Sequence, residues 1–197
     1  MDLAISRPVL AEAFGAADGR ARLARQVLLV VLGVALLTAA AKIRVPMWPV
    51  PVTMQTFAVL VLGAAYGARL GFATLLAYLA LGAAGVAVFT GSDAGLAYFA
   101  GPTAGYLLGF LLAATAMGAL ARRGWDRTVA SMVGALLIGN AIIYAVGLPW
   151  MAYLFLEDRG AAWVFQWGVG NFLLGDALKL ALAALLLPTL WTLMPRR

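Results

Sequence analysis

The chain is divided into long apolar stretches, separated by short segments that carry most of its charge and proline. The stretches show no alternation of apolar and polar residues with a period of two, so they predict membrane helices and not the strands of a barrel. The six stretches cover approximately residues 26–41, 52–67, 70–89, 103–121, 128–146 and 164–187. The predicted fold class is therefore an all-α integral membrane protein with six transmembrane helices.

An even number of spans puts both ends of the chain on one side of the membrane. The basic residues on that side are Arg7, Arg20, Arg22, Arg25, Arg69, Arg122, Arg123, Arg127, Arg196 and Arg197. The other side carries only Lys42, Arg44 and Arg159. Because cytoplasmic segments carry the excess of Lys and Arg, both termini are predicted to be cytoplasmic. Residues 1–24 are expected to form a cytoplasmic tail and residues 25–197 the membrane domain.

Composition agrees with a membrane protein and removes several classes of function. Of the 197 residues, 64% are hydrophobic and 11% are charged, and the mean hydropathy is +0.97. The chain has no cysteine and no histidine, which excludes disulfides, thiol catalysis, Cys/His metal sites and imidazole chemistry. No metal and no cofactor are expected. The net charge of +6 lies mostly at predicted helix ends, so it indicates membrane orientation and not nucleic-acid binding.

An acid and a base interrupt the last apolar stretch, at Asp176 and Lys179 of the motif GDALK. Each charge costs about 2.5–3.5 kcal/mol near the bilayer centre on insertion scales, so some interaction must offset the cost. A spacing of three places two side chains about 60° apart around a helix, close enough to share one polar pocket. Gly168, Asn171 and Gly175 fall on the same side. The pair, with Asn171, is predicted to form a functional site; a structural ion pair to a neighbouring helix is the alternative.

Polar residues also mark the start of the second stretch and the middle of the fifth. Thr53, Gln55 and Thr56 stand where the second helix is expected to begin. The Gln55 amide offers two donors and an acceptor, which suits binding of an amide or ureido group. Helix capping and interhelical hydrogen bonding explain Thr53 and Thr56 equally well. Asn140 is predicted to make an interhelical hydrogen bond.

The segment GPTAGY at residues 101–106 combines helix-start residues with glycines that leave backbone amides open to a ligand. Thr103 lies near the expected cap, and Tyr106 is placed to form the wall of a pocket. Tyr98, in the preceding loop, is placed to close over a ligand, and an aromatic belt at the membrane interface is the alternative. Thr103, Tyr106 and Tyr98 are therefore candidate binding residues.

Four blocks occur in order along the chain: KIRVP at residues 42–46, PVPVTMQTF at 49–57, GPTAGYLLGF at 101–110 and GDALK at 175–179. Together they resemble the BioY family, the biotin-binding S-components of energy-coupling factor (ECF) transporters. The resemblance implies a six-helix S-component bundle that binds biotin with high affinity near its outer side. It also implies biotin uptake across the cytoplasmic membrane.

The resemblance further implies roles for the last block, whose acid and base contact biotin in the family. It assigns those contacts to Asp176 and Lys179. The chemistry agrees, because a ureido group donates and accepts hydrogen bonds and a carboxylate binds a cation. A last helix beginning at Val164 would put Asp176 about 18 Å below the outer rim. A start nearer Gly170 fits an outer pocket better.

Partners are implied by the same resemblance: a transmembrane coupling subunit and a pair of ATPase subunits. Such S-components often dock the coupling subunit through an Ala-xxx-Ala pattern on the first helix, which is found here at Ala35 and Ala39. The chain has no G-x-x-x-x-G-K-[ST] loop, so it is not expected to hydrolyse ATP by that route.

Two other classes of function share parts of this pattern. An S-component or small carrier for a different vitamin would share the fold and orientation and differ only in its pocket. An intramembrane aspartyl protease also uses a Gly-Asp motif, but it needs a second carboxylate within the membrane. All other acids of the chain lie in predicted loops or tails. The chain is therefore predicted to be a transport protein and not an enzyme.

Overall fold

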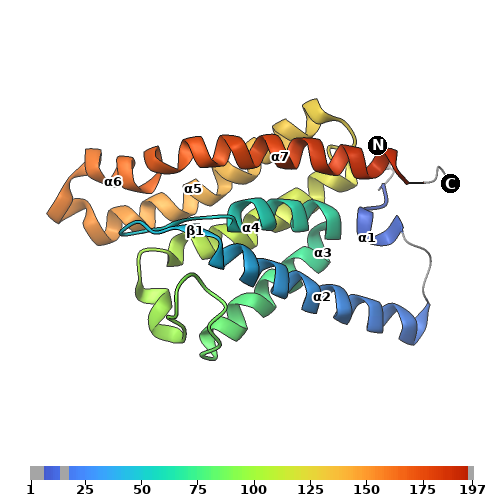
Figure 1. Cartoon of the computed structure of the whole chain (residues 1–197), viewed down its shortest axis with the longest axis horizontal. Helices are drawn as coiled ribbons and strands as arrows, with labels where there is room; N and C mark the ends of the chain where they lie inside the picture. The colour runs from blue at the N-terminus through green and yellow to red at the C-terminus, as the bar shows by residue number, and fades with distance from the viewer. Residues whose placement is uncertain (1–6, 14–17, 195–197) are drawn as a thin grey trace, which may run out of the picture.

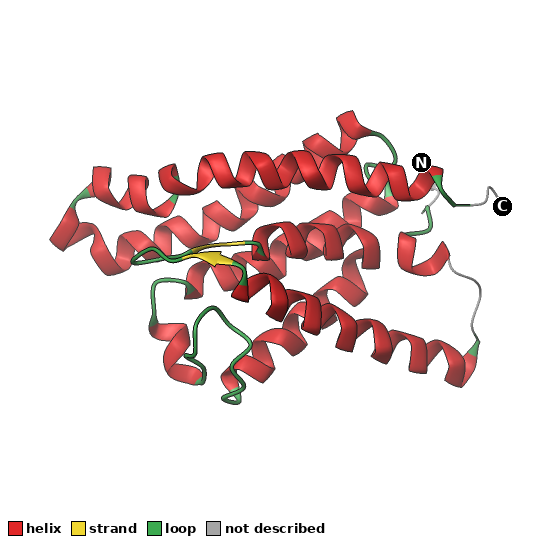
Figure 2. Cartoon of the chain, in the orientation of Figure 1, coloured by secondary structure: helices red, strands yellow, loops and turns green. Residues whose placement is uncertain are grey.

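The computed structural model describes residues 7–13 and 18–194, which form helices and one short two-stranded ladder (Figure 2). In chain order the elements are α1 (Leu10–Ala13), α2 (Gly19–Lys42), β1 (Arg44–Val45), β2 (Val52–Thr53), α3 (Gln55–Ala83), η1 (Leu96–Ala100), α4 (Ala104–Arg122), α5 (Val129–Arg159), α6 (Ala161–Gly168), η2 (Gly170–Phe172) and α7 (Leu173–Thr192). Within the described residues, five helical segments are long and apolar enough to cross a membrane. The prediction of an all-α, multi-pass membrane protein is therefore confirmed.

Helix α3 is not straight but folds back on itself at Gly67. The Gly67 backbone has φ 79° and ψ 168°, a conformation that is essentially restricted to glycine. A Cβ on Gly71 would lie 3.4 Å from Cα of Gly63, whereas residues eight apart in a straight helix are separated by about 12 Å. The two halves of α3 therefore lie against each other at the turn. The turn falls between the second and third apolar stretches of the sequence.

The start of the chain is more helical than its composition indicates. Helix α2 begins at Gly19 and not near Gln26, so Arg20, Arg22 and Arg25 occupy its first turns. Helices commonly extend beyond their apolar part into water, where charged residues are solvated. Before it, the short helix α1 turns Leu10 into the core.

At one end of the bundle, the residues before α1 contact the end of α4 and lie near the end of α7 (Figure 1). The backbone amide of Arg7 donates to the Arg122 carbonyl at 3.0 Å. The Arg127 guanidinium donates to the Pro8 carbonyl at 2.7 Å and lies 3.3 Å from the Trp191 ring centroid. We call this the terminal end and the opposite end the loop end.

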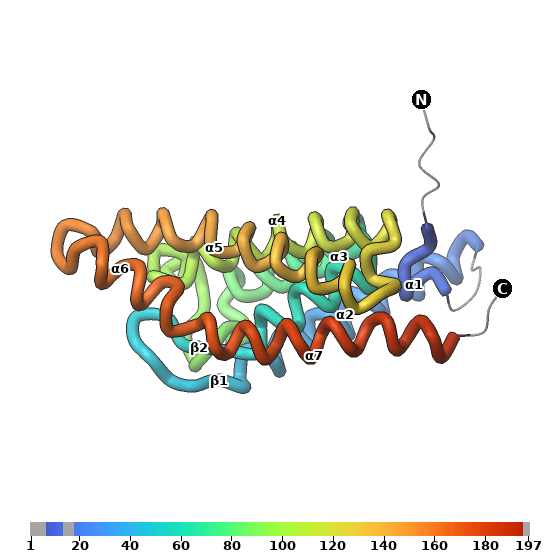
Figure 3. Tube along the Cα trace, turned by 90° about the horizontal axis from the view of Figure 1, so that it is seen from above, coloured from blue at the N-terminus to red at the C-terminus, as the bar shows by residue number. Residues whose placement is uncertain are grey.

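The loop end holds the β1–β2 ladder, η1 and α6. Lys42, the last residue of α2, donates to the carbonyls of Ala87, Phe89 and Gly91 at 2.8, 2.8 and 2.7 Å. These three bonds use all the protons of the ammonium group and fix the segment after α3. Helix α7 starts at Leu173 after the break at η2 and runs beside α5 towards the terminal end (Figure 3).

Candidate functional site

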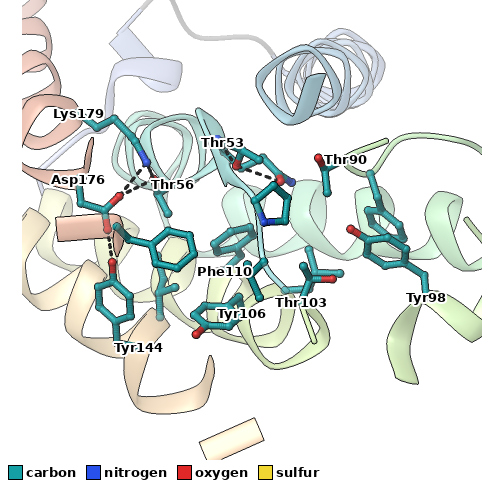
Figure 4. A pocket seen from close by; sticks show the side chains of 17 residues that line it. Thr53, Thr56, Thr90, Tyr98, Thr103, Tyr106, Phe110, Tyr144, Asp176 and Lys179 are labelled. Atoms are coloured by element: carbon teal, nitrogen blue, oxygen red, sulfur yellow. Dashed lines mark hydrogen bonds and ion pairs between the residues drawn. The ribbon is translucent and has the colours of Figure 1, made fainter. Parts of the chain in front are cut away.

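A cavity with about 550 Å³ of empty space, including its part open to solvent, lies at the loop end of the bundle. Its walls come from the segment before α3, from η1, and from α3, α4, α5 and α7 (Figure 4). The lining residues are Val50, Pro51, Thr53, Gln55, Thr56, Phe89, Thr90, Tyr98, Thr103, Tyr106, Leu107, Phe110, Ile143, Tyr144, Phe172, Asp176 and Lys179.

The charged pair of α7 forms one end of this cavity. Asp176 and Lys179 are each 7% exposed. Lys179 Nζ donates to Asp176 Oδ1 at 2.8 Å and to Thr56 Oγ1 at 2.8 Å. The Thr56 hydroxyl also approaches Asp176 Oδ1 at 3.3 Å. The pair thus joins α7 to α3 and also lines the cavity, so its geometry agrees with either alternative drawn from the sequence.

Tyr144 on α5 completes this end, and sequence analysis missed it. Its hydroxyl donates to Asp176 Oδ2 (Figure 4). Asp176 is therefore held by neighbours on three helices, and both of its oxygens accept hydrogen bonds. The one sequence pattern that pointed to Tyr144 was its position one helical turn after Asn140, inside an otherwise apolar stretch.

The opposite end of the cavity is neutral and carries hydroxyl groups. Tyr98 stacks on Phe89 with ring centroids 4.6 Å apart, and Thr90 and Thr103 lie beside it (Figure 4). Burial raises the pKa of the Tyr98 phenol above its ordinary value, so the group stays protonated at neutral pH. This end therefore offers hydrogen-bond donors.

Aromatic rings separate the charged end from the hydroxyl end. Phe110 and Tyr106 lie between them in Figure 4. The Tyr106 hydroxyl donates to the Gly168 carbonyl at 2.8 Å, which fixes the ring against the wall. The cavity thus has polar groups at two ends and an apolar middle, the usual composition of a selective small-molecule site.

Gln55 lies at the cavity with its amide already bonded. Its Nε2 donates to the Tyr78 hydroxyl at 2.8 Å, and its Oε1 accepts from the Thr53 hydroxyl at 3.3 Å. Gln55 is 5% exposed. One amide proton and the remaining capacity of the oxygen are left for a ligand.

Two asparagines behave differently from the sequence-based expectation. Asn171 is not among the cavity-lining residues; its Oδ1 accepts from Gln166 Nε2 at 2.6 Å on the exposed side of the break before α7. Asn140 makes no hydrogen bond with the described residues, so the predicted interhelical bond is wrong. Its side chain borders a smaller cavity behind the charged pair, which Thr56 also lines.

The structure therefore brings six of the seven predicted site residues to one cavity. These are Asp176, Lys179, Gln55, Thr103, Tyr106 and Tyr98. The start of α7 at Leu173 also agrees with the expectation of a start near Gly170, and it keeps Asp176 in the first turn of the helix.

Comparison with known proteins then identifies the family. The model of the BioY family matches residues 11–196, nearly the whole chain. The chain belongs to the BioY family. The "Probable biotin transporter BioY" of Pyrococcus horikoshii is 38% identical over 163 residues, which cover 83% of this chain and 94% of the relative.

Other BioY proteins extend this similarity. The "Biotin transporter BioY" of Rhizobium etli is 37% identical, with 70% of this chain and 76% of the relative covered. That of Thermotoga maritima is 34% identical, with 82% and 93% covered. Since BioY proteins are named as transporters, the prediction that the chain is not an enzyme is confirmed.

The fold is also that of a solved structure, "Crystal structure at 2.1 A of the S-component for biotin from an ECF-type ABC transporter". The TM-score is 0.73 at 22% sequence identity, with 89% of this chain and 95% of that chain covered. At this low sequence identity, the structural similarity shows a shared fold.

Proposed function

We propose that the chain binds biotin in the cavity at the loop end and is the substrate-specific component for biotin uptake across the cell membrane. The observation that carries the proposal is the Asp176–Lys179 pair, buried in an apolar bundle yet forming a cavity wall. The identity of the proposed ligand comes from the BioY relatives, which are named as biotin transporters. Biotin is the transported ligand here and not a cofactor.

The cavity has a charged pair at one end and neutral hydroxyl groups at the other, which suggests how biotin lies in it. Asp176 and Lys179 together are neutral, and they present an acceptor beside a donor. A ureido group, which donates from nitrogen and accepts at oxygen, matches such a pair, whereas a carboxylate would meet the repulsion of Asp176. We therefore place the ureido ring at the charged end.

The biotin carboxylate then points towards the hydroxyl end of the cavity. Arg44 of β1 reaches this end, with Nη1 donating to Thr90 Oγ1 at 3.4 Å. Thr90 lines the cavity. Among the described residues this is the only side-chain hydrogen bond of Arg44, so most of its donors remain available to a carboxylate.

Six spans and cytoplasmic termini form part of the proposal. Counting the two halves of α3, residues 55–66 and 68–83, as separate short spans gives six. Both described ends of the chain then lie at the terminal end, as the bonds from Arg7 and Arg127 support. Basic residues gather there, which favours the cytoplasmic side.

Docking to an ECF coupling subunit is proposed through α2. Ala35 and Ala39 are exposed on this helix, as are the neighbouring Val31, Leu32 and Leu36. An exposed apolar face of this kind is covered by lipid or by another membrane helix, and small residues allow close helix contact. ATPase subunits bound to the coupling subunit would then supply the energy.

Binding measurements with purified protein test the proposed ligand. We expect biotin to bind to the full chain in detergent, and thiamine and riboflavin to leave its binding unchanged when added in excess. Isothermal titration calorimetry with each vitamin measures this directly. Binding of thiamine or riboflavin with equal affinity would instead support the alternative, an S-component for a different vitamin.

The orientation of biotin is tested with Arg44. We expect Arg44→Gln to weaken biotin binding about threefold to fivefold, the effect of one partly exposed charge contact. Biotinamide, which lacks the carboxylate charge, is expected to bind both proteins equally. Equal loss of affinity for biotin and biotinamide would place the carboxylate elsewhere.

A further inference from the structure

A second large hollow lies at the terminal end, between α2 and the rest of the bundle. It contains about 1420 Å³ of empty space, including its part open to solvent. Figure 1 shows α2 diverging from the other helices towards this end. Nearer the middle of the bundle, α2 is held against α3, because the Tyr66 hydroxyl donates to the Leu29 carbonyl at 2.9 Å. The hollow is thus a fork that closes towards the middle of the membrane.

Four arginines from three helices surround the hollow: Arg22, Arg25, Arg69 and Arg122. The two acids in its wall are Glu12 and Asp18, so the wall carries an excess of two positive charges. Such an excess in a recess beside apolar helices favours an anionic ligand.

The four arginines differ in whether their side chains are already bonded to other groups of the protein. Arg122 forms a two-point ion pair with Glu12, at 2.6 and 3.2 Å. Burial raises the pKa of Glu12, but the hydrogen bond and charge of Arg122 and the charge of Arg22 hold it below its ordinary value. Glu12 is therefore ionised and neutralises Arg122. The Arg25 guanidinium donates to the Ala11 carbonyl.

Arg22 and Arg69 are the two that remain available. Within residues 7–13 and 18–194, neither side chain makes a hydrogen bond or an ion pair. Both are exposed and face the hollow from opposite helices, α2 and α3. Two unpaired guanidinium groups across a recess suit a phosphate, which accepts hydrogen bonds on several oxygens.

The wall becomes apolar with depth. Leu29 lies about 10 Å farther along α2 than Arg22, and Leu70 and Ala73 follow Arg69 on α3. The charged groups thus lie at the membrane surface and the apolar groups within the acyl region. A soluble anion would use only the arginines, whereas a phospholipid matches both parts of the wall.

We propose that this fork is a binding site for an anionic phospholipid, with the phosphate between Arg22 and Arg69 and an acyl chain against Leu29 and Leu70. Basic recesses between membrane helices commonly bind such head groups. The inference does not depend on biotin as the transported ligand. It needs only the terminal end to lie at the level of the head groups.

Native mass spectrometry of the full chain in detergent tests the site, with palmitoyl-oleoyl phosphatidylglycerol as the probe and the matching phosphatidylcholine as comparison. We expect the first phosphatidylglycerol to bind more tightly than phosphatidylcholine. The double variant Arg22→Gln/Arg69→Gln is expected to lower its affinity at least fivefold, because each basic residue near the surface contributes about 1 kcal/mol.

The matched control is Arg20→Gln/Arg123→Gln, which removes two exposed arginines of the same end that do not line the fork. It is expected to keep the wild-type lipid affinity, and thermal unfolding of both variants in the same detergent should show that they fold. Equal losses in the two variants would overturn the proposal, as would equal binding of the two lipids. Displacement of the bound lipid by excess inorganic phosphate would overturn it in favour of a free anion.

Discussion

Replacing Lys179 with methionine is expected to weaken biotin binding at least tenfold, which corresponds to about 1.4 kcal/mol. The substitution removes a donor that we place against the ureido oxygen. It also leaves Asp176, which is 7% exposed, without its cation. Since breaking a buried ion pair commonly costs about 3–5 kcal/mol, we expect a clear loss of thermal stability as well. Calorimetric titration and thermal unfolding without biotin measure the two effects.

The double variant Asp176→Asn/Lys179→Met separates binding from stability. It leaves no unpaired buried charge, so its stability is expected to return towards that of the wild type. Its affinity for biotin is expected to stay low, because both ligand contacts are changed. If affinity returned together with stability, the pair would be purely structural. Unchanged affinity in Lys179→Met and in Asp176→Asn would remove both residues from the site.

Replacing Gly118 with alanine is expected to destabilise the whole fold. A Cβ on Gly118 would lie 2.1 Å from the backbone nitrogen of Ala68 and 2.3 Å from the carbonyl carbon of Gly67. Both atoms belong to the turn of α3, which no side-chain rotation can move away. Overpacking of this kind costs about 1–3 kcal/mol and occasionally more, so we expect a lower unfolding temperature or loss of folded protein.

Gly134→Ala is the matched control for this prediction. A Cβ at Gly134 would lie 3.4 Å from the Trp125 ring, an ordinary contact. Because alanine is a better helix former than glycine by up to about 1 kcal/mol, the control is expected to be neutral or stabilising. Thermal unfolding of both variants in the same detergent compares them. Equal stability would show that α4 does not pack closely against the turn.

The sequence predicted those parts of the molecule that depend on local pattern. The apolar stretches located the helices. The interruption of apolar residues at Gly67 and Arg69 separated the second stretch from the third, and the structure joins these two by a sharp turn. The cost of burying charge singled out Asp176 and Lys179. The predicted boundaries were wrong at both starts and ends of helices. Helix α2 begins earlier, at Gly19, and α5 continues to Arg159 instead of ending near residue 146.

Other parts of the cavity depend on long-range packing, which periodicity does not contain. Tyr144 meets Asp176 only because α5 lies beside α7 at the right height. Asn171 shares a helical face with Lys179 in an ideal helix, but the break at η2 turns it away. Asn140 points into a cavity where the described residues offer no partner. In these three cases the role of the polar residue depends on where the fold turns its side chain, which the sequence pattern does not show.

Lys42 links α2 to the segment after α3 that forms part of the cavity wall. It ends α2, the helix proposed to meet the coupling subunit, and it grips the carbonyls around Phe89. Phe89 and Thr90 belong to the cavity wall. A tilt of α2 would therefore be expected to displace the segment around Phe89 at the cavity wall through these three hydrogen bonds.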